Sequence, residues 1–161
     1  MRRLMFLFGA VVMLLTTSCL KGPTSGGTSE SSFKGKLVVT NMENGKTTYT
    51  DDNAALTVTI PDILQPKLDL LFLEVKFADA MPYPINMELK GIPFVVTVSD
   101  DGMSLNYTFE AENVIPTDFE QYPINKVKGC LGRVIDVEFE MASRGSRVRF
   151  TTNTGDSENN Q

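Results

Sequence analysis

Residues 104–112 read SLNYTFEAE, the longest uninterrupted alternation of polar and apolar side chains in the chain. Leu105, Tyr107, Phe109 and Ala111 share one parity, and the residues between them are polar or acidic. Successive side chains of a β-strand point to opposite faces, so this period of two predicts a strand with one buried and one solvated face. The chain is therefore expected to build a sheet whose apolar face must be covered.

The same alternation occurs on both sides of this stretch, and turn residues separate the segments. Asp101-Gly102 precedes it and is typical of a tight hairpin turn, because glycine accepts the positive φ that such turns need. Asn44-Gly45 marks a second tight turn in the same way. Strands are predicted over residues 33–40, 46–50, 56–60, 67–77, 85–90, 94–98, 105–112, 135–141 and 147–150.

Three local features refine this pattern. The acidic segment at 51–53 is expected to be a turn that separates two strands. The apolar parity changes near Leu71, which predicts a β-bulge or a strong bend. Thr117 and Glu120 have the spacing of a helix-capping box, so one short helical turn is expected over residues 118–122.

Charges are complementary across the turn predicted at residues 143–145. Glu138 and Glu140 alternate with apolar residues before the turn, and Arg147 and Arg149 do so after it. An antiparallel hairpin would set Glu140 opposite Arg147 and Glu138 opposite Arg149. Each such cross-strand pair contributes about 0.2–1 kcal/mol, which favours this register without holding the fold.

About ten short segments joined by hairpin-length turns predict an all-β antiparallel meander. Because no helix is expected to cover the apolar faces, they must meet one another in a β-sandwich or in a closed barrel. The bend near Leu71 and the glycines Gly129 and Gly132 favour closure. We therefore predict a closed barrel, with a β-sandwich as the alternative.

The N-terminal segment, residues 1–19, reads MRRLMFLFGAVVMLLTTSC. Two arginines precede an apolar run that is too short for a membrane span of about 20 residues but typical of a secretory signal. The run ends directly in Cys19, as in bacterial lipoprotein signals, although Thr16 stands where leucine is usual. We expect residues 1–18 to be removed and Cys19 to be acylated. The alternative is an ordinary signal or anchor in which Cys19 is incidental.

The rest of the chain reads as one tethered domain. Residues 19–32 are rich in glycine, serine and threonine and predict a flexible tether. The folded domain is expected over 33–152, followed by a polar, disordered tail over 153–161. This organisation predicts a protein held by lipid at the bacterial cell envelope, at the outer membrane, facing the periplasm or the cell surface.

The composition disfavours several classes of function. The formal net charge is −5, so no nucleic-acid partner is expected. The chain has no histidine, the residue that supplies most general bases near neutral pH and most zinc sites. Cys130, beside Lys126 and Lys128 on the predicted outer face, is expected to be a free thiol. We predict that the chain is not an enzyme and uses no cofactor or metal.

Two acidic features could indicate a calcium site or a catalytic carboxylate pair, but an ordinary structural role is favoured for each. The Asp-Asp pairs at 51–52 and 100–101 lack the ligand spacing of a calcium loop and are typical of turns. Glu110 and Glu112 share one strand face, as a glycosidase carboxylate pair would, yet that face is polar and is expected to face water.

The chain resembles the calycin-like, or lipocalin-like, lipoproteins of Bacteroidetes over about residues 33–152. The resemblance rests on the leader and on four segments: FKGKL at 33–37, VKFADAMPYPINMELKGI at 75–92, EAENVIP at 110–116 and KGCLGR at 128–133. It implies an eight-stranded antiparallel barrel with no known reaction or ligand. Lipocalins carry Gly-x-Trp in the first strand, whereas this chain has Leu37 in place of the tryptophan.

Aromatic residues of inward parity are expected to line the barrel. They are Phe72, Phe77, Phe94, Tyr107, Phe109, Phe139 and Phe150. A barrel of this size is either filled by its side chains or hollow enough for one small ligand, so two functions stay open. The chain either carries a small apolar or amphipathic ligand, or it is a filled interaction, inhibitory or assembly module for another envelope protein.

Three predicted loops, at residues 40–46, 79–84 and 114–123, hold apolar residues outside the alternation. These residues include Met42, Met81, Tyr83, Phe119 and Tyr122. If they are exposed, they suit contacts with another protein, where methionine and aromatic residues are enriched. The alternative is that they plug the ends of the barrel.

Overall fold

The computed structural model describes residues 28–62, 64–99, 102 and 104–152. The predicted signal at 1–18, the predicted lipidation site Cys19 and the predicted tail at 153–161 lie outside these residues. Within them, eight strands form a closed antiparallel barrel in which each strand pairs with its neighbour along the chain and the last pairs with the first. The predicted all-β meander and its closure into an eight-stranded barrel are confirmed.

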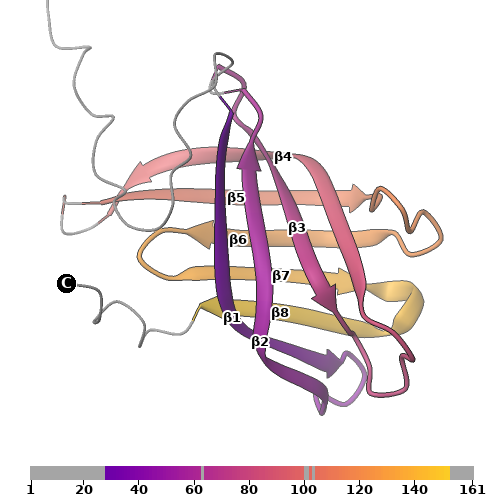
Figure 1. Ribbon diagram of the computed structural model, residues 1–161. Helices are drawn as coiled ribbons and strands as arrows, with labels where there is room; N and C mark the ends of the chain where they lie inside the picture. The colour runs from indigo at the N-terminus through magenta and orange to yellow at the C-terminus, as the bar shows by residue number, and fades with distance from the viewer. Residues whose placement is uncertain (1–27, 63, 100–101, 103, 153–161) are drawn as a thin grey trace, which may run out of the picture.

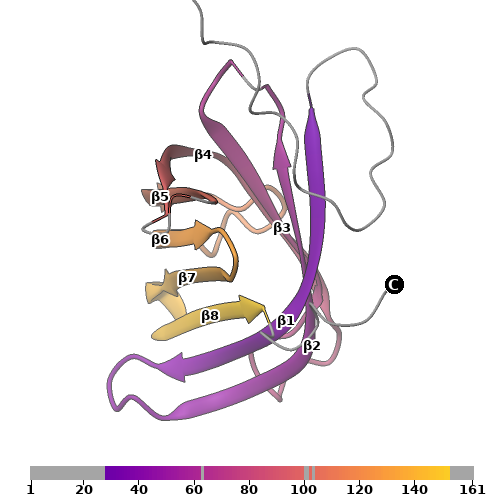
Figure 2. The ribbon, with the colours of Figure 1, turned by 90° about the vertical axis from the view of Figure 1, so that its left-hand side faces the viewer.

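The barrel is built from two layers of strands. Figure 1 shows β1, β2 and β3 crossing in front of β5 to β8, while β4 bends and takes part in both layers. In the side view of Figure 2 the two layers face each other across the core. The strands are β1 (Ser29–Asn41), β2 (Thr47–Ile60), β3 (Lys67–Val75), β4 (Ile85–Val98), β5 (Leu105–Val114), β6 (Ile124–Leu131), β7 (Ile135–Met141) and β8 (Ser146–Thr152), with a 3₁₀ turn, η1 (Ala142–Arg144), between β7 and β8.

β2 runs unbroken through the acidic segment that was expected to be a turn. Gly35 pairs with Ala54 but Leu37 pairs with Asp51, so β2 accommodates one extra residue at this point. The Asp51 carboxylate accepts a hydrogen bond from the N–H of Asn53 at 2.9 Å. The acidic segment is therefore a β-bulge, which bends a strand without ending it, and the predicted break was wrong.

β4 likewise joins two segments that were predicted as separate strands. Its pairing with β3 shifts by one residue between Leu68 and Leu70. Gly91 adopts a φ of 69° at the shift, and its N–H donates to the Asp69 carboxylate at 2.7 Å. A glycine in this left-handed conformation is typical of a bulge, and it bends β4 from one layer into the other.

The bulge predicted in β3 is present, although not at Leu71. The pairing of β3 with β4 shifts between Phe72 and Val75, which are both buried despite their opposite parity. Between them, Glu74 adopts a φ of 50°, and its N–H donates to the Asn86 side chain at 2.8 Å. The inward face therefore changes parity at Glu74.

β1 begins earlier than the sequence predicts. Order was expected from Phe33, at the end of a tether spanning residues 19–32, but Ser29 already pairs with Ile60 of β2. The serine-rich start of the strand shows no apolar alternation because it lies at the rim of the barrel, where its side chains are exposed. Backbone pairing with β2 is sufficient to extend the strand there.

The predicted register of β7 and β8 is confirmed, since Glu140 pairs with Arg147 and Glu138 with Arg149. Arg147 forms its ion pair with Glu140 at 2.8 Å. Arg149 instead reaches diagonally to Asp136 and donates two hydrogen bonds to it, at 2.9 and 2.6 Å. A guanidinium binds two carboxylate oxygens at once when its fork faces them, and Asp136 offers that geometry.

The interior of the barrel is filled by side chains. Phe72, Phe139 and Phe150 are fully buried, with ring centroids 5.3 Å apart for Phe72 and Phe139 and 6.3 Å apart for Phe72 and Phe150. These rings have no solvent-accessible surface, whereas a hollow as large as a water molecule would leave some on its walls. The aromatic centre of the barrel is therefore packed solid, and it is completed by Leu37, Val39, Leu56, Leu68, Leu70, Val75 and Leu89.

The helical turn expected over residues 118–122 does not form. Phe119 donates its N–H to the carbonyl of Pro116 at 3.3 Å, which closes a β-turn. The Thr117 hydroxyl donates to the Glu88 carboxylate of β4 at 3.2 Å and so does not cap a helix. The connection is anchored to the barrel wall by this side chain, and the predicted capping box was wrong.

Candidate functional site

The two ends of the barrel differ. The β1–β2, β3–β4, β5–β6 and β7–β8 connections lie at one end, which we call the closed end (Figure 1). There the N–H of Met42 donates to the carbonyl of Gly145 at 2.8 Å. The guanidinium of Arg144 donates to the hydroxyl of Tyr122 at 2.5 Å and lies 4.3 Å from the centre of its ring. These contacts join neighbouring connections and hold the closed end together.

The apolar loop residues singled out from the sequence all lie at the closed end, and they divide between the two expectations. Met81 and Phe119 pack against the core and plug the barrel. Met42 and Tyr83 are 40% and 76% exposed. Tyr122 is half-buried. The closed end is therefore partly plugged, while Met42 and Tyr83 stay exposed at its rim.

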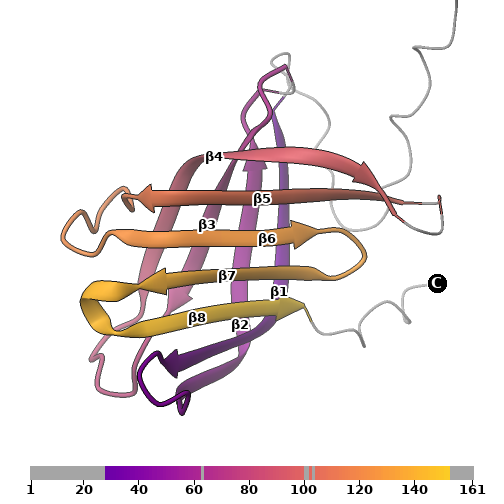
Figure 3. The same cartoon turned by 180° about the vertical axis from the view of Figure 1, so that it is seen from behind.

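The opposite end, which we call the open end, consists of the β2–β3, β4–β5 and β6–β7 connections and the strand ends beside them. Among the described residues it carries most of the large apolar side chains that are exposed. They are Leu64 at 87%, Val95 at 63%, Val96 at 51%, Val98 at 64%, Leu105 at 39% and Val134 at 37% exposure. Figures 1 and 3 show the β4–β5 hairpin, which holds four of them, reaching beyond the β6–β7 turn.

The parity of this hairpin is as the sequence predicts, but its exposure is not. Phe94 and Tyr107 pack against the core from the inner face, with ring centroids 5.5 Å apart. Val96, Val98 and Leu105 continue the same face toward the tip and are exposed. Periodicity assigns these three residues to the core because it reports the face of a strand and not how far the strand extends past the opposite layer.

The tip of the hairpin is held by its own hydrogen bonds. The N–H of Ser99 donates to the carbonyl of Ser104 at 2.9 Å, and the N–H of Gly102 donates to the carbonyl of Ser99 at 2.8 Å. The N–H of Ser104 also donates to the Ser99 hydroxyl at 3.1 Å. The exposed valines are thus presented by an ordered two-stranded arm, while the acidic pair at 100–101 lies outside the described residues.

The aromatic residues expected to line the barrel fall into two groups. Phe94 and Tyr107 are partly buried beside the open end. The others are buried in the core, namely Phe72, Phe77, Phe109, Phe139 and Phe150. None of the seven is free to grip a ligand at the packed centre.

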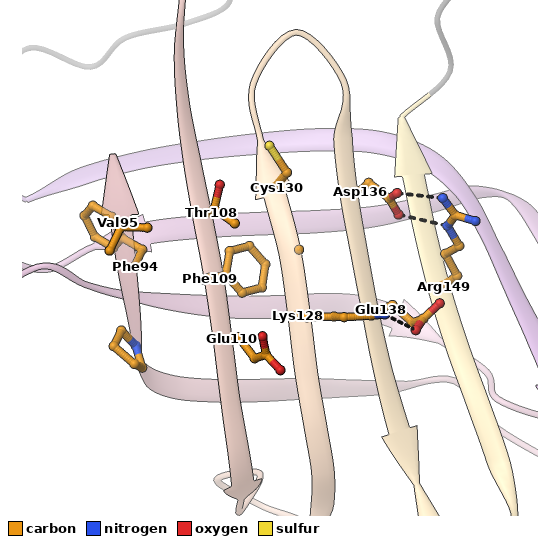
Figure 4. A pocket seen from close by; sticks show the side chains of 12 residues that line it. Phe94, Val95, Thr108, Phe109, Glu110, Lys128, Cys130, Asp136, Glu138 and Arg149 are labelled. Carbon is orange, nitrogen blue, oxygen red and sulfur yellow. Dashed lines mark hydrogen bonds and ion pairs between the residues drawn. The ribbon is translucent and has the colours of Figure 1, made fainter. Parts of the chain in front are cut away.

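An open groove of about 780 Å³ lies on the outer face of β4 to β8 (Figure 4). Lys128 and Arg149 line it, and each is paired with a carboxylate, Glu138 at 3.1 Å and Asp136 at 2.6 Å. Cys130 is a half-buried free thiol in the same groove, on the outer face as predicted. Because both lining cations are already paired, the groove offers no free positive charge to an anionic ligand.

The acidic residues singled out from the sequence make local contacts or face water. Asp51 bonds to the backbone of the bulge, and Asp52 pairs with Lys36 at 3.0 Å. Glu110 forms an ion pair with Lys126, and Glu112 is exposed. Within the described ranges, no three histidine, cysteine, aspartate or glutamate side chains lie close enough together to hold a metal ion.

The Glu110–Lys126 pair gives a testable pH dependence. The hydrogen bond from Lys126 and its charge lower the pKa of the Glu110 carboxyl. Lys126→Met is therefore expected to raise that pKa toward its ordinary value, as followed by carboxyl ¹³C NMR. The stabilisation from this pair is present above the ordinary pKa of a glutamate and is lost as the pH falls through the lowered one.

The matched control for this titration is Lys128→Met, because Lys128 acts on Glu110 only through its more distant charge. A smaller rise in the Glu110 pKa is expected from it. Equal shifts in the two variants, or no shift in Lys126→Met, would show that the ion pair does not persist in solution.

In comparisons with known proteins, no protein-family model, curated protein or solved structure matches this chain. The resemblance to calycin-like lipoproteins therefore stays a prediction. Across the described part of the chain, no helix has the length and apolar character needed to cross a membrane.

Proposed function

We propose that this chain is a non-enzymatic, lipid-anchored β-barrel of the bacterial cell envelope that binds another protein through its β4–β5 hairpin. The observation that carries the proposal is the exposure of Val95, Val96, Val98 and Leu105 on that hairpin. Soluble domains rarely present neighbouring apolar side chains to water unless a partner covers them. Branched aliphatic side chains on a rigid arm bury area on binding at little cost in conformational entropy.

The packed core favours this function over the carriage of a small molecule. A typical ligand site has a volume of roughly 300–1,000 Å³ and encloses most of the ligand. In this barrel the central rings are in mutual contact and fully buried. The carriage of a small ligand, which the sequence slightly favoured with an interaction module as the alternative, would require that core to open. Native mass spectrometry of protein from its own host would favour the carrier only if a small molecule remained bound.

The position of β1 supports a membrane-side location for the hairpin. Ser29 pairs with Ile60, so the chain enters the barrel at the open end. A flexible segment of about ten residues, the length from Cys19 to the start of β1, reaches roughly 17 Å. A tether from an acylated Cys19 would therefore hold the open end toward the membrane, within reach of an envelope protein.

The chemistry of the described residues agrees with a binding role. The chain has no histidine, and Lys128 and Arg149, the cations that line the outer groove, are occupied by carboxylates. An active site needs a base or nucleophile with a group that orients it. The carboxylates that line the groove are held in ion pairs, which leaves the thiol of Cys130. We infer that the protein acts by binding another protein and not by catalysis.

Site-specific photocrosslinking in living host cells tests the proposal. A benzoylphenylalanine residue in place of Val98 in the full-length chain is expected to give a discrete protein adduct. The same probe in place of Tyr83, an exposed aromatic at the closed end, is expected to give none. Adding Val96→Lys to the Val98 probe should reduce the adduct about tenfold or more, because the lysine would be buried unpaired at a cost above 1.4 kcal/mol.

Two outcomes would contradict the proposal. One is equal labelling from the Val98 and Tyr83 positions, which would mean that the probe reports collisions. The other is a Val98 adduct that Val96→Lys leaves unchanged, since a hairpin contact could not tolerate that charge. A normal circular dichroism spectrum for each variant shows that the barrel has folded.

A further inference from the structure

β4 leaves part of its backbone unpaired at the open end. Residues Phe94–Val98 pair with β5 on one side, but β3 pairs with β4 only as far as Pro93. One further bond follows, from the N–H of Phe94 to the carbonyl of Pro66 at 3.0 Å. Among the described residues, no strand pairs with the other edge of residues 95–98, so alternate N–H and C=O groups there face away from β5.

A second open edge, on β1, has a different character. β8 pairs with β1 only from Gly35 onward, so residues 29–34 pair with β2 alone among the described strands. That edge carries Glu30 and Lys34 among serines. Charged and polar side chains are the usual means by which proteins prevent open edges from pairing with other chains.

The β4 edge lacks this protection. From Gly91 to Ser99 the sequence is GIPFVVTVS, without a charged residue. Pro93 and the bulge at Gly91 lie where the pairing of β3 with β4 stops, before the open part of the edge begins. They therefore do not protect the open part. Val95, Val96 and Val98 are exposed on both faces of the open segment. Such an edge has high β-propensity and nothing to repel another strand.

We propose that the open edge of β4 pairs with the same edge of a second copy of this chain, which joins two barrels into a two-fold symmetric dimer with a continuous sheet. This inference rests on the proposed function, because it names the partner of the β4–β5 hairpin. An isologous contact requires a surface that complements itself.

The β4 edge meets that requirement in an antiparallel register centred on Thr97, because Pro66 already occupies the position opposite Phe94. This register sets Val96 of each copy opposite Val98 of the other, and it brings the two Thr97 side chains together. Every cross-strand pair is then β-branched, and no like charges face each other. A two-fold axis perpendicular to the sheet keeps the inner faces of both hairpins on the same side, so their exposed apolar faces become continuous.

Disulfide trapping of the full-length chain tests this register. In a Cys130→Ser background, Thr97→Cys places two thiols opposite each other across the axis, at a Cβ separation of about 4.5 Å that is within the range of a disulfide. Oxidation with copper phenanthroline is expected to convert most of the chain to a reducible dimer on a non-reducing gel. The Cys130→Ser background alone should give no such dimer.

Two matched controls separate the edge from general exposure. Leu105→Cys lies on the same hairpin but on β5, away from the open edge, and Ser32→Cys lies on the charged edge of β1. Each is expected to form at least about tenfold less dimer than Thr97→Cys, because its thiols would lie outside disulfide distance. Adding Val96→Lys to Thr97→Cys should reduce the dimer to the same low level, since it protects the edge with a charge.

The inference is overturned if Thr97→Cys forms no more dimer than Leu105→Cys or Ser32→Cys. It is also overturned if Val96→Lys has no effect on the Thr97→Cys dimer. The photocrosslinking from Val98 distinguishes this failure from that of the proposed function: an adduct with a different protein would keep the hairpin as a docking site and exclude the second copy, whereas an adduct of twice the monomer mass would support both.

Discussion

Phe139→Ala is expected to lower the free energy of unfolding by about 3–5 kcal/mol, the usual cost of removing a buried aromatic ring. Phe139 has no exposed surface, and its ring lies 5.3 Å from that of Phe72 and 5.9 Å from that of Phe77. The smaller side chain would leave a cavity that these rings cannot fill without leaving their own positions. Because a domain of this size is stable by about 5–15 kcal/mol, the loss should be plain in urea-induced unfolding.

The control for this experiment is Val98→Ala, which removes apolar atoms from an exposed position. It is expected to change the unfolding free energy by no more than about 0.5 kcal/mol. A loss below about 1 kcal/mol in Phe139→Ala would mean that the centre of the barrel is loosely packed, and it would reopen the carriage of a small ligand.

Gly129→Ala is expected to cost about 3 kcal/mol, at the upper end of the usual range for overpacking. Phe109 pairs with Gly129 across β5 and β6, and its ring covers the glycine on the inner face. A Cβ at this position would collide with that ring and with the backbone carbonyl oxygen of Asp136 on β7. The carbonyl belongs to the sheet and cannot move without straining the pairing of β6 with β7.

Gly132→Ala provides the matched control, since it adds the same methyl group in the turn that follows β6. There the methyl group would meet the side-chain amide of Asn106, which can rotate away, and no backbone atom at short distance. A change within about 1 kcal/mol is expected by urea-induced unfolding. If Gly129→Ala were as well tolerated as Gly132→Ala, the contact between Phe109 and Gly129 would not constrain the sheet.

Local pattern was sufficient to predict the class of fold and part of its register. The alternation over 135–141 and 147–150 placed acidic residues opposite arginines, and the structure pairs Glu140 with Arg147 as expected. Turn chemistry was equally informative at Gly45 and Gly102, which both adopt positive φ. These features are read correctly because strand parity and tight turns depend on neighbouring residues alone.

β-Bulges lie at the two places where the sequence predicted a pair of strands and the structure has one continuous strand. The acidic segment in β2 and Gly91 in β4 carry the same residue types as loops, yet both positions bend a strand that continues. Whether such a segment reverses the chain or bends it depends on the strand that lies beside it. A single sequence does not specify that neighbour.

The exposed apolar surface of the β4–β5 hairpin was not predicted, for a related reason. Val96, Val98 and Leu105 have the parity of core residues, and only the length of the opposing layer decides that they are exposed. The unpaired edge of β4 depends in the same way on where β3 begins, which is set by the β2–β3 connection. The loop residues that the sequence offered as contact points instead serve in part to plug the closed end, as Met81 and Phe119 do.

Closure of the barrel by its first and last strands sets the order in which the molecule can be completed. β1 meets β8 through pairs such as Gly35 with Thr152, which join the two extremes of the described chain. Contacts between such distant segments slow folding, because the whole intervening chain must be confined before the bond is gained. A ribosome or a translocation channel that delivers the chain from its N-terminus therefore releases seven strands before the eighth arrives. Until β8 has emerged, β1 and β7 each have an unpaired edge that can pair with another chain. The chain therefore depends most on protection from aggregation during this interval.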